Sequence, residues 1–164
     1  MAILVDIQRA WTLQETPGAA SIESWVNAAL GNRTGPFELN IRIVDQLESA
    51  ELNLHYRGKE GPTNVLSFPF DAVTPEPLPI LGDLVICAPI LVREAVEQQK
   101  TTTAHWAHIV IHGVLHLLGY DHIEDQDAEQ MESLETEIML VLDFPPPYRI
   151  LHESSDDPIE VTSS

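Results

Sequence analysis

The chain has 164 residues, of which 44% are hydrophobic, and its 26 acidic and eight basic residues give a net charge of -18. This length suits one domain with a buried core, and the acidity excludes a broad electrostatic grip on nucleic acid. One cysteine excludes an internal disulfide, and no apolar run is long enough to cross a bilayer, so we expect a soluble, cytoplasmic protein with no membrane partner.

The first part of the chain predicts two strands, each followed by a helix. Residues 3–8 and 37–44 have the apolar pattern of strands. An amphipathic helix is expected over residues 21–30, with Ser21 as its N-cap. A second helix should run from Asp45 toward Tyr56, because Asp45 followed by Glu48 is an acidic variant of the capping-box spacing.

The second part predicts two more strands and then three helices. The strands are expected at residues 64–70 and 82–88, separated by a proline-rich loop. Pro89 suits the first turn of a helix, the next helix should run over 105–118 and stop at Gly119, and Asp125 or Asp127 should open the last. Apolar positions 131, 134, 138 and 141 predict that this last helix packs on one face and exposes an acidic face to solvent.

This order of elements predicts an α+β fold, a small four-stranded mixed sheet packed with about five helices. We expect one domain over residues 1–150. Three consecutive prolines at 145–147 should end regular structure, and residues 151–164 are expected to be an acidic, disordered tail.

Residues 112–122 read HGVLHLLGYDH and predict a metal site at the end of a core helix. His112 and His116, four residues apart, point the same way on a helix. Gly119 lets the chain leave the helix in a left-handed conformation and bring His122 back toward the pair. A lone helical histidine is usually a core or surface residue, but three at this spacing favour one catalytic zinc per chain, with a fourth position left for water.

The same spacing matches the zincin pattern of metzincin proteases at every ligand and at the glycine. Gly113, however, stands where those enzymes need a glutamate as general base. A metzincin-like peptidase is therefore a weak alternative.

Several other side chains are candidates for the same site. Arg57 and Lys59 follow a predicted helix and could clamp a phosphate, although a solvated turn explains them equally well. Substrate contacts are further predicted for Asn64, Ser67 and His108, and His105 and His108 could instead be second-shell donors or plain helix residues. Asp83 and Asp121 are candidate second-shell partners of a ligand histidine.

YRGKEGPTNVLSFPF (residues 56–70), LGDLVI (81–86) and HGVLHLLGYDH together resemble the YbeY family of bacterial metal-dependent endoribonucleases, over roughly residues 40–142. The resemblance implies a small mixed sheet covered by helices and one zinc held by His112, His116 and His122, with Arg57 as the functional arginine. It also implies cleavage of single-stranded RNA, maturation of the 3' end of small-subunit ribosomal RNA, late ribosome quality control, and ribosomal subunits and ribosomal proteins as partners.

The residues support such chemistry, because zinc-activated water supplies hydroxide at neutral pH and Arg57 would stabilise charge on the phosphate. The attacking group stays open between that water and the ribose 2'-hydroxyl, and nickel or copper would also bind imidazoles. The acidity requires either a local basic patch of Arg57, Lys59 and Arg42 or a protein partner. A non-catalytic ribosome assembly factor with a structural metal is the alternative from another class.

Overall fold

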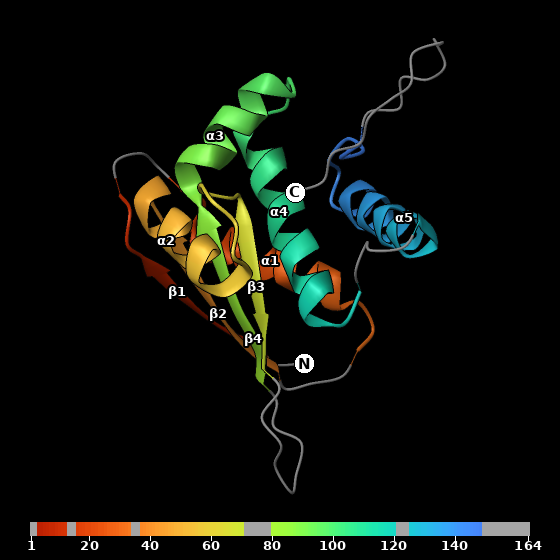
Figure 1. Cartoon of the computed structure of the whole chain (residues 1–164). Helices are drawn as coiled ribbons and strands as arrows, with labels where there is room; N and C mark the ends of the chain where they lie inside the picture. The colour runs from red at the N-terminus through yellow and green to blue at the C-terminus, as the bar shows by residue number, and fades with distance from the viewer. Residues whose placement is uncertain (1–2, 13–15, 34–36, 71–79, 121–124, 149–164) are drawn as a thin grey trace, which may run out of the picture.

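The computed structural model describes residues 3–12, 16–33, 37–70, 80–120 and 125–148, and shows a four-stranded sheet in the order β1-β2-β4-β3 (Figure 1). Strands β1 (Ile3–Arg9), β2 (Phe37–Val44) and β4 (Ile80–Cys87) are parallel neighbours. Strand β3 (Val65–Pro69) runs antiparallel to β4 at one edge. The predicted mixed sheet is therefore confirmed.

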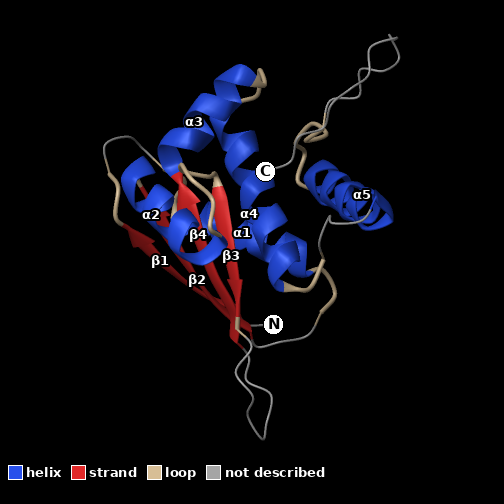
Figure 2. Cartoon of the chain, viewed as in Figure 1, coloured by secondary structure: helices blue, strands red, loops and turns tan. Residues whose placement is uncertain are grey.

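Within the described ranges five helices accompany this sheet, as expected, and Figure 2 shows how they lie around it. They are α1 (Ala19–Leu30), α2 (Gln46–Arg57), α3 (Ala88–Glu97), α4 (Thr102–Leu117) and α5 (Asp125–Val141). Among the described residues, no helix combines the length and apolar character required to span a membrane.

The main core lies between the sheet and helices α1 and α4. Apolar side chains of β2 and β4, such as Ile41 and Leu84, pack there with Ile111 and Leu115 of α4, and all four are fully buried. A smaller apolar cluster on the other face involves Leu52 of α2 and Ile90 of α3. Because α4 lies between the sheet and α5 (Figure 1), it is buried along most of its length.

Side-chain caps open α2 and α4, and two predicted helix starts are corrected. Asp45 caps α2 as predicted, with its carboxylate accepting from the Glu48 backbone N–H at 2.9 Å. Ser21 does not cap α1, because that helix begins at Ala19 after Gly18. Helix α4 begins three residues earlier than predicted, since the Thr101 hydroxyl accepts from the Ala104 N–H at 3.1 Å and satisfies one of the free amides of the first turn.

Close contact between α4 and the sheet depends on Gly113. A Cβ at this position would lie 2.8 Å from Leu84 Cδ2 on β4, so the helix face at Gly113 presses directly on the sheet. A glutamate here would point toward buried strand β4, away from the solvent where a general base acts. The fold therefore explains why the position of the protease base carries glycine.

The buried face of α5 matches the predicted one at Met131, Leu134 and Ile138 and differs from it at Glu135 and Val141. Its fully or nearly buried residues are Met131, Glu135, Ile138 and Met139, whereas Val141 is 79% exposed. The prediction of a solvent-facing acidic side fails at Glu135, which is 0% exposed and lies within the apolar stripe. Glu135 instead bonds to two histidines of α4.

Candidate metal centre

His112 and His116 bring two ring nitrogens together on α4. Their Nε2 atoms lie 3.2 Å apart, with ring planes at 80°. Two nitrogens bound to one tetrahedral zinc at about 2.0–2.1 Å would lie about 3.3–3.4 Å apart. His112 is buried and His116 partly exposed, so the pair sits where the core meets the surface. The geometry of these two imidazoles fits a shared metal ion.

The helix ends directly after this pair, at Leu117, and Gly119 follows as the pattern predicts. The Tyr120 backbone N–H donates to the Leu115 carbonyl at 3.0 Å, and Gly119 has a φ of 107°, a conformation that favours glycine. The chain thus bends at Gly119 before His122. His122 and Asp121 themselves lie outside the described residues, so their predicted roles stay predictions.

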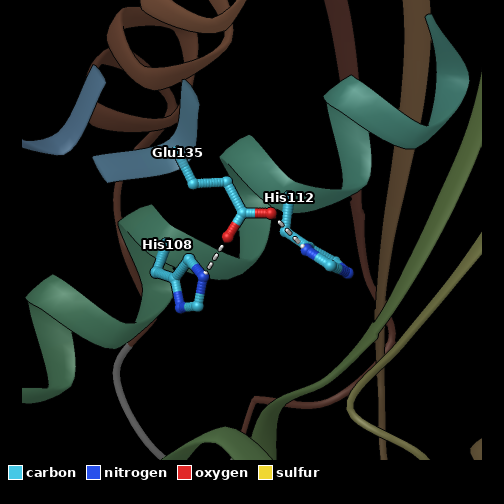
Figure 3. A group of neighbouring side chains, drawn as sticks. All are labelled: His108, His112 and Glu135. Atoms are coloured by element: carbon cyan, nitrogen blue, oxygen red, sulfur yellow. Dashed lines mark hydrogen bonds and ion pairs between the residues drawn. The ribbon is translucent and has the colours of Figure 1, made fainter. Parts of the chain in front are cut away.

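Behind His112 lies Glu135 of α5, a carboxylate shared by two histidines (Figure 3). Its Oε1 accepts from His108 Nε2 and its Oε2 accepts from His112 Nδ1, both at 2.7 Å. The Tyr148 hydroxyl donates to Oε1 at 2.6 Å. One fully buried carboxylate therefore receives three hydrogen bonds, which is what an ionised acid in the core requires.

These contacts set the protonation of the cluster. Burial alone would raise the pKa of Glu135, but the hydrogen bonds from His108 and His112 outweigh it and hold that pKa well below its usual range. Burial lowers the pKa of His108 to about 4, so its ring is neutral at pH 7. Burial, together with the adjacent charge of Glu135, raises the pKa of Tyr148 and keeps its hydroxyl a donor.

An ionised carboxylate only accepts hydrogen bonds, so His112 must carry its proton on Nδ1. Its Nε2 then presents a lone pair toward His116, which is the state that a metal ligand needs. His108, His112 and Glu135 also have ligand atoms within 4.8 Å of one another, so this buried group could itself hold a metal ion.

The predicted phosphate-binding residues lie at the C-terminal end of α2 and directly after it. Arg57 is the last residue of α2, before Gly58 with its φ of 68°, and Lys59 follows; both are exposed. Arg42 does not join them in a basic patch, because it makes a bidentate ion pair with Glu48, at 2.6 Å and 3.1 Å. Phosphate binding by Arg57 and Lys59 stays a prediction.

Of the two predicted substrate contacts near β3, Ser67 is partly exposed and Asn64 is buried. Ser67 pairs with Leu84 in the sheet and is partly exposed. Asn64 is 5% exposed, and its amide donates to Glu94 at 3.2 Å, a carboxylate that also pairs with His105 at 2.8 Å. Because Asn64 is buried and bonded to Glu94, its role is structural, and its position does not support a substrate contact.

His108 lies behind the histidine pair, which fits the second-shell alternative for it, whereas Asp83 does not lie there. His108, predicted as a substrate contact, is 6% exposed and bonded to Glu135. Asp83, predicted behind a ligand histidine, alternates with Leu84 and so faces away from α4, where Asn40 donates to it at 2.9 Å. The acid observed behind His112 is Glu135, which the sequence prediction missed.

Glu135 could have been found from its spacing. It follows Met131 by four residues and precedes Ile138 by three, so it lies in an apolar helical stripe where an unpaired acid is unfavourable. Tyr148 carried no comparable signal, since it follows three prolines and its contact depends on the tertiary fold.

A mixed sheet, a buried helix with paired histidines and a carboxylate behind them define an α/β protein with a candidate metal centre on its core helix. The chain belongs to a family of such proteins, the YbeY endoribonucleases, because the family model described as Endoribonuclease YbeY matches residues 7–143. It is also similar to the solution structure of TM1509 from Thermotoga maritima, with 27% identity and a TM-score of 0.54, over 86% of this chain and 91% of that one. Family membership supports a general role as a metal-dependent endoribonuclease in ribosomal RNA processing.

Proposed function

We propose that this protein is a zinc-dependent endoribonuclease that cleaves single-stranded RNA during maturation of the 3' end of small-subunit ribosomal RNA. Late ribosome quality control, ribosomal subunits and ribosomal proteins as partners, and a cytoplasmic location belong to the same proposal. The observation that carries it is the 3.2 Å approach of the His112 and His116 Nε2 atoms in a chain of the endoribonuclease family.

In this proposal His112, His116 and His122 hold one zinc ion. Neutral imidazoles are ligands that zinc favours, and Gly119, with a φ of 107°, allows the chain to turn before His122. When bound, the ion supplies Lewis-acid activation of water and of a phosphoryl oxygen. We place it on the Nε2 side of His112, because Nδ1 is already used by Glu135 at 2.7 Å.

Arg57 is proposed to bind the phosphate whose bond is cleaved. Its guanidinium is exposed at the end of α2, and a planar fork of donors can contact two phosphate oxygens at once. With a net charge of -18 for the chain, this local contact rather than a broad field must hold the RNA. Ribosomal partners would supply the remaining affinity.

The test is cleavage of matched single-stranded and duplex RNA by purified protein, with added zinc or with a chelator. We expect cleavage of the single strand alone, loss with the chelator, and a fall of at least about a hundredfold for His116→Ala and for Arg57→Ala, since one lost charge-stabilising group costs about 2.7–4 kcal/mol. Arg93→Ala is the control, because Arg93 is an exposed arginine of α3 whose ion pair is with Glu97.

Cleavage that persists in His116→Ala and Arg57→Ala would reveal a contaminating nuclease. Zinc binding without any cleavage by the wild-type protein would contradict the proposal and favour a non-catalytic assembly factor with a structural metal.

A further inference from the structure

We infer that Glu135 is a positioning residue for the metal centre: its carboxylate fixes the ring orientation and tautomer of His112, while His108 and Tyr148 fix the carboxylate. This inference rests on the proposed zinc site and adds two residues to it. Glu135 of α5 lies beside His108 and His112 (Figure 3), and Tyr148 follows α5 in the chain and bonds to Glu135.

The two oxygens of Glu135 have separate partners. Oε2 accepts from His112 Nδ1, whereas Oε1 accepts from both His108 Nε2 and the Tyr148 hydroxyl. Two donors on one oxygen prevent the carboxyl group from turning, so the other oxygen remains directed at His112. With a side-chain exposure of 0% for Glu135, no solvent competes for either oxygen.

These contacts fix His112 in one tautomer and one ring orientation. The Nδ1 proton is held by Oε2, so the lone pair is on Nε2, 3.2 Å from Nε2 of His116. Without the carboxylate, Nδ1 would lose the acceptor that holds its proton, and this contact would no longer favour one tautomer. A ligand held in one tautomer binds metal more tightly, because no reorganisation precedes binding.

His108 bonds to Glu135 and does not act as a substrate contact. Its Nε2 is used by Glu135, and its Nδ1 is buried without a hydrogen-bond partner among the residues that the structure describes. An ion bound directly between His108, His112 and Glu135 would have to replace both 2.7 Å hydrogen bonds in a group whose side chains are at most 8% exposed. Such a closed site leaves no open position for a reacting water.

Tyr148 brings the segment after α5 into the same network. It lies beyond residues 7–143, the stretch matched by the family model. Phe144 anchors this segment by an edge contact with Trp25 of α1, with ring centroids 6.4 Å apart, and by a backbone bond to Met139 at 2.9 Å. The segment is therefore held against the domain where Tyr148 reaches Glu135.

The test compares wild type with Glu135→Gln and Tyr148→Phe, and uses Glu137→Gln as a matched control on the exposed side of α5. Nitrogen-15 spectra of the metal-free proteins report the His112 tautomer, and chelator competition reports the zinc dissociation constant. Glu135→Gln removes the same charge as the control but leaves one acceptor oxygen for three donors. We expect wild type to show one tautomer with the proton on Nδ1.

We expect Glu135→Gln to mix the tautomers and weaken zinc binding by about 10–100-fold. Tyr148→Phe should change both readouts in the same direction by a smaller factor, and Glu137→Gln should match wild type. Unchanged tautomer and affinity in Glu135→Gln would overturn the inference; if that variant does not fold, the same result in Tyr148→Phe overturns it. Wild type that binds no zinc would instead refute the proposed site, while the tautomer readout in metal-free protein still judges Glu135.

Discussion

Replacing His108 by glutamine should remove an acid-sensitive part of the protein's stability. The folded protein holds His108 neutral, with a pKa of about 4, because its ring is buried. In the unfolded chain the same ring is solvated and takes up a proton near pH 6.5. Since the unfolded chain then binds a proton that the folded protein does not, lowering the pH below about 6.5 favours unfolding, and the loss is complete near pH 4.

The size of this effect follows from the gap between the two pKa values. At about 1.36 kcal/mol for each unit, a gap from 6.5 to about 4 sets a limit of about 3 kcal/mol. Between pH 7.5 and pH 5 the expected loss is about 2 kcal/mol. Glu135 adds little in this window, because its pKa is lowered in the fold and its contribution is lost only below the pKa of an unfolded glutamate, near 4.3.

Urea denaturation of metal-free wild type and His108→Gln at pH 7.5 and pH 5 measures the difference. A glutamine amide can still donate to Glu135, and it does not titrate. The other histidines contribute equally to both proteins, so wild type should lose about 2 kcal/mol more than the variant over this range. Equal losses in the two proteins would show that His108 is not held neutral by burial, and the account of the cluster would be wrong.

Three further predictions concern the framework. Gly113→Glu should cost several kcal/mol in urea denaturation and create no peptidase activity, because its side chain would meet Leu84 of the core; a stable variant that cleaves peptides would contradict this. Thr101→Ala should lower the free energy of unfolding by about 1 kcal/mol through loss of the α4 cap, whereas Thr103→Ala, at an exposed position in the first turn, should not. Burial raises the pKa of Cys87, so disulfide reagents at pH 8 should modify it far more slowly in the folded protein than in urea, and equal rates would show that it is accessible.

Local features of the fold were predictable because nearby residues determine them. Asp45 caps α2 through the amide three residues later, and His112 and His116 meet because residues four apart share a helix face. The bend at Gly119 likewise follows from the conformational freedom of glycine. In each case, the residues that determine the feature lie within about one helical turn of each other.

The network behind the histidines was not predictable from such rules. Glu135 meets His112 across 23 residues and Tyr148 meets Glu135 across 13, so these contacts depend on how α5 and the following segment pack against α4. The same limit explains the error at Asp83, whose direction depends on its register in β4 rather than on its position near the motif. A buried acid in an apolar helical stripe is the signal that deserves more weight in similar sequences.

The acidity of the chain remains compatible with RNA cleavage if binding is local. Exposed Arg57 and Lys59 provide that contact in the proposal, while the ion pair with Glu48 removes Arg42 from it. Binding that depends on few phosphate contacts should depend weakly on salt, since each neutralised phosphate adds to the salt dependence.

The central claim is that His112 and His116 share one ion through their Nε2 atoms. The most direct measurement is a crystal structure of the zinc-loaded protein with anomalous diffraction at the zinc edge. The account predicts one anomalous peak, about 2.0–2.1 Å from Nε2 of both residues, with the hydrogen bond from His112 Nδ1 to Glu135 intact. A peak between His108, His112 and Glu135, or no peak near these histidines, would contradict it.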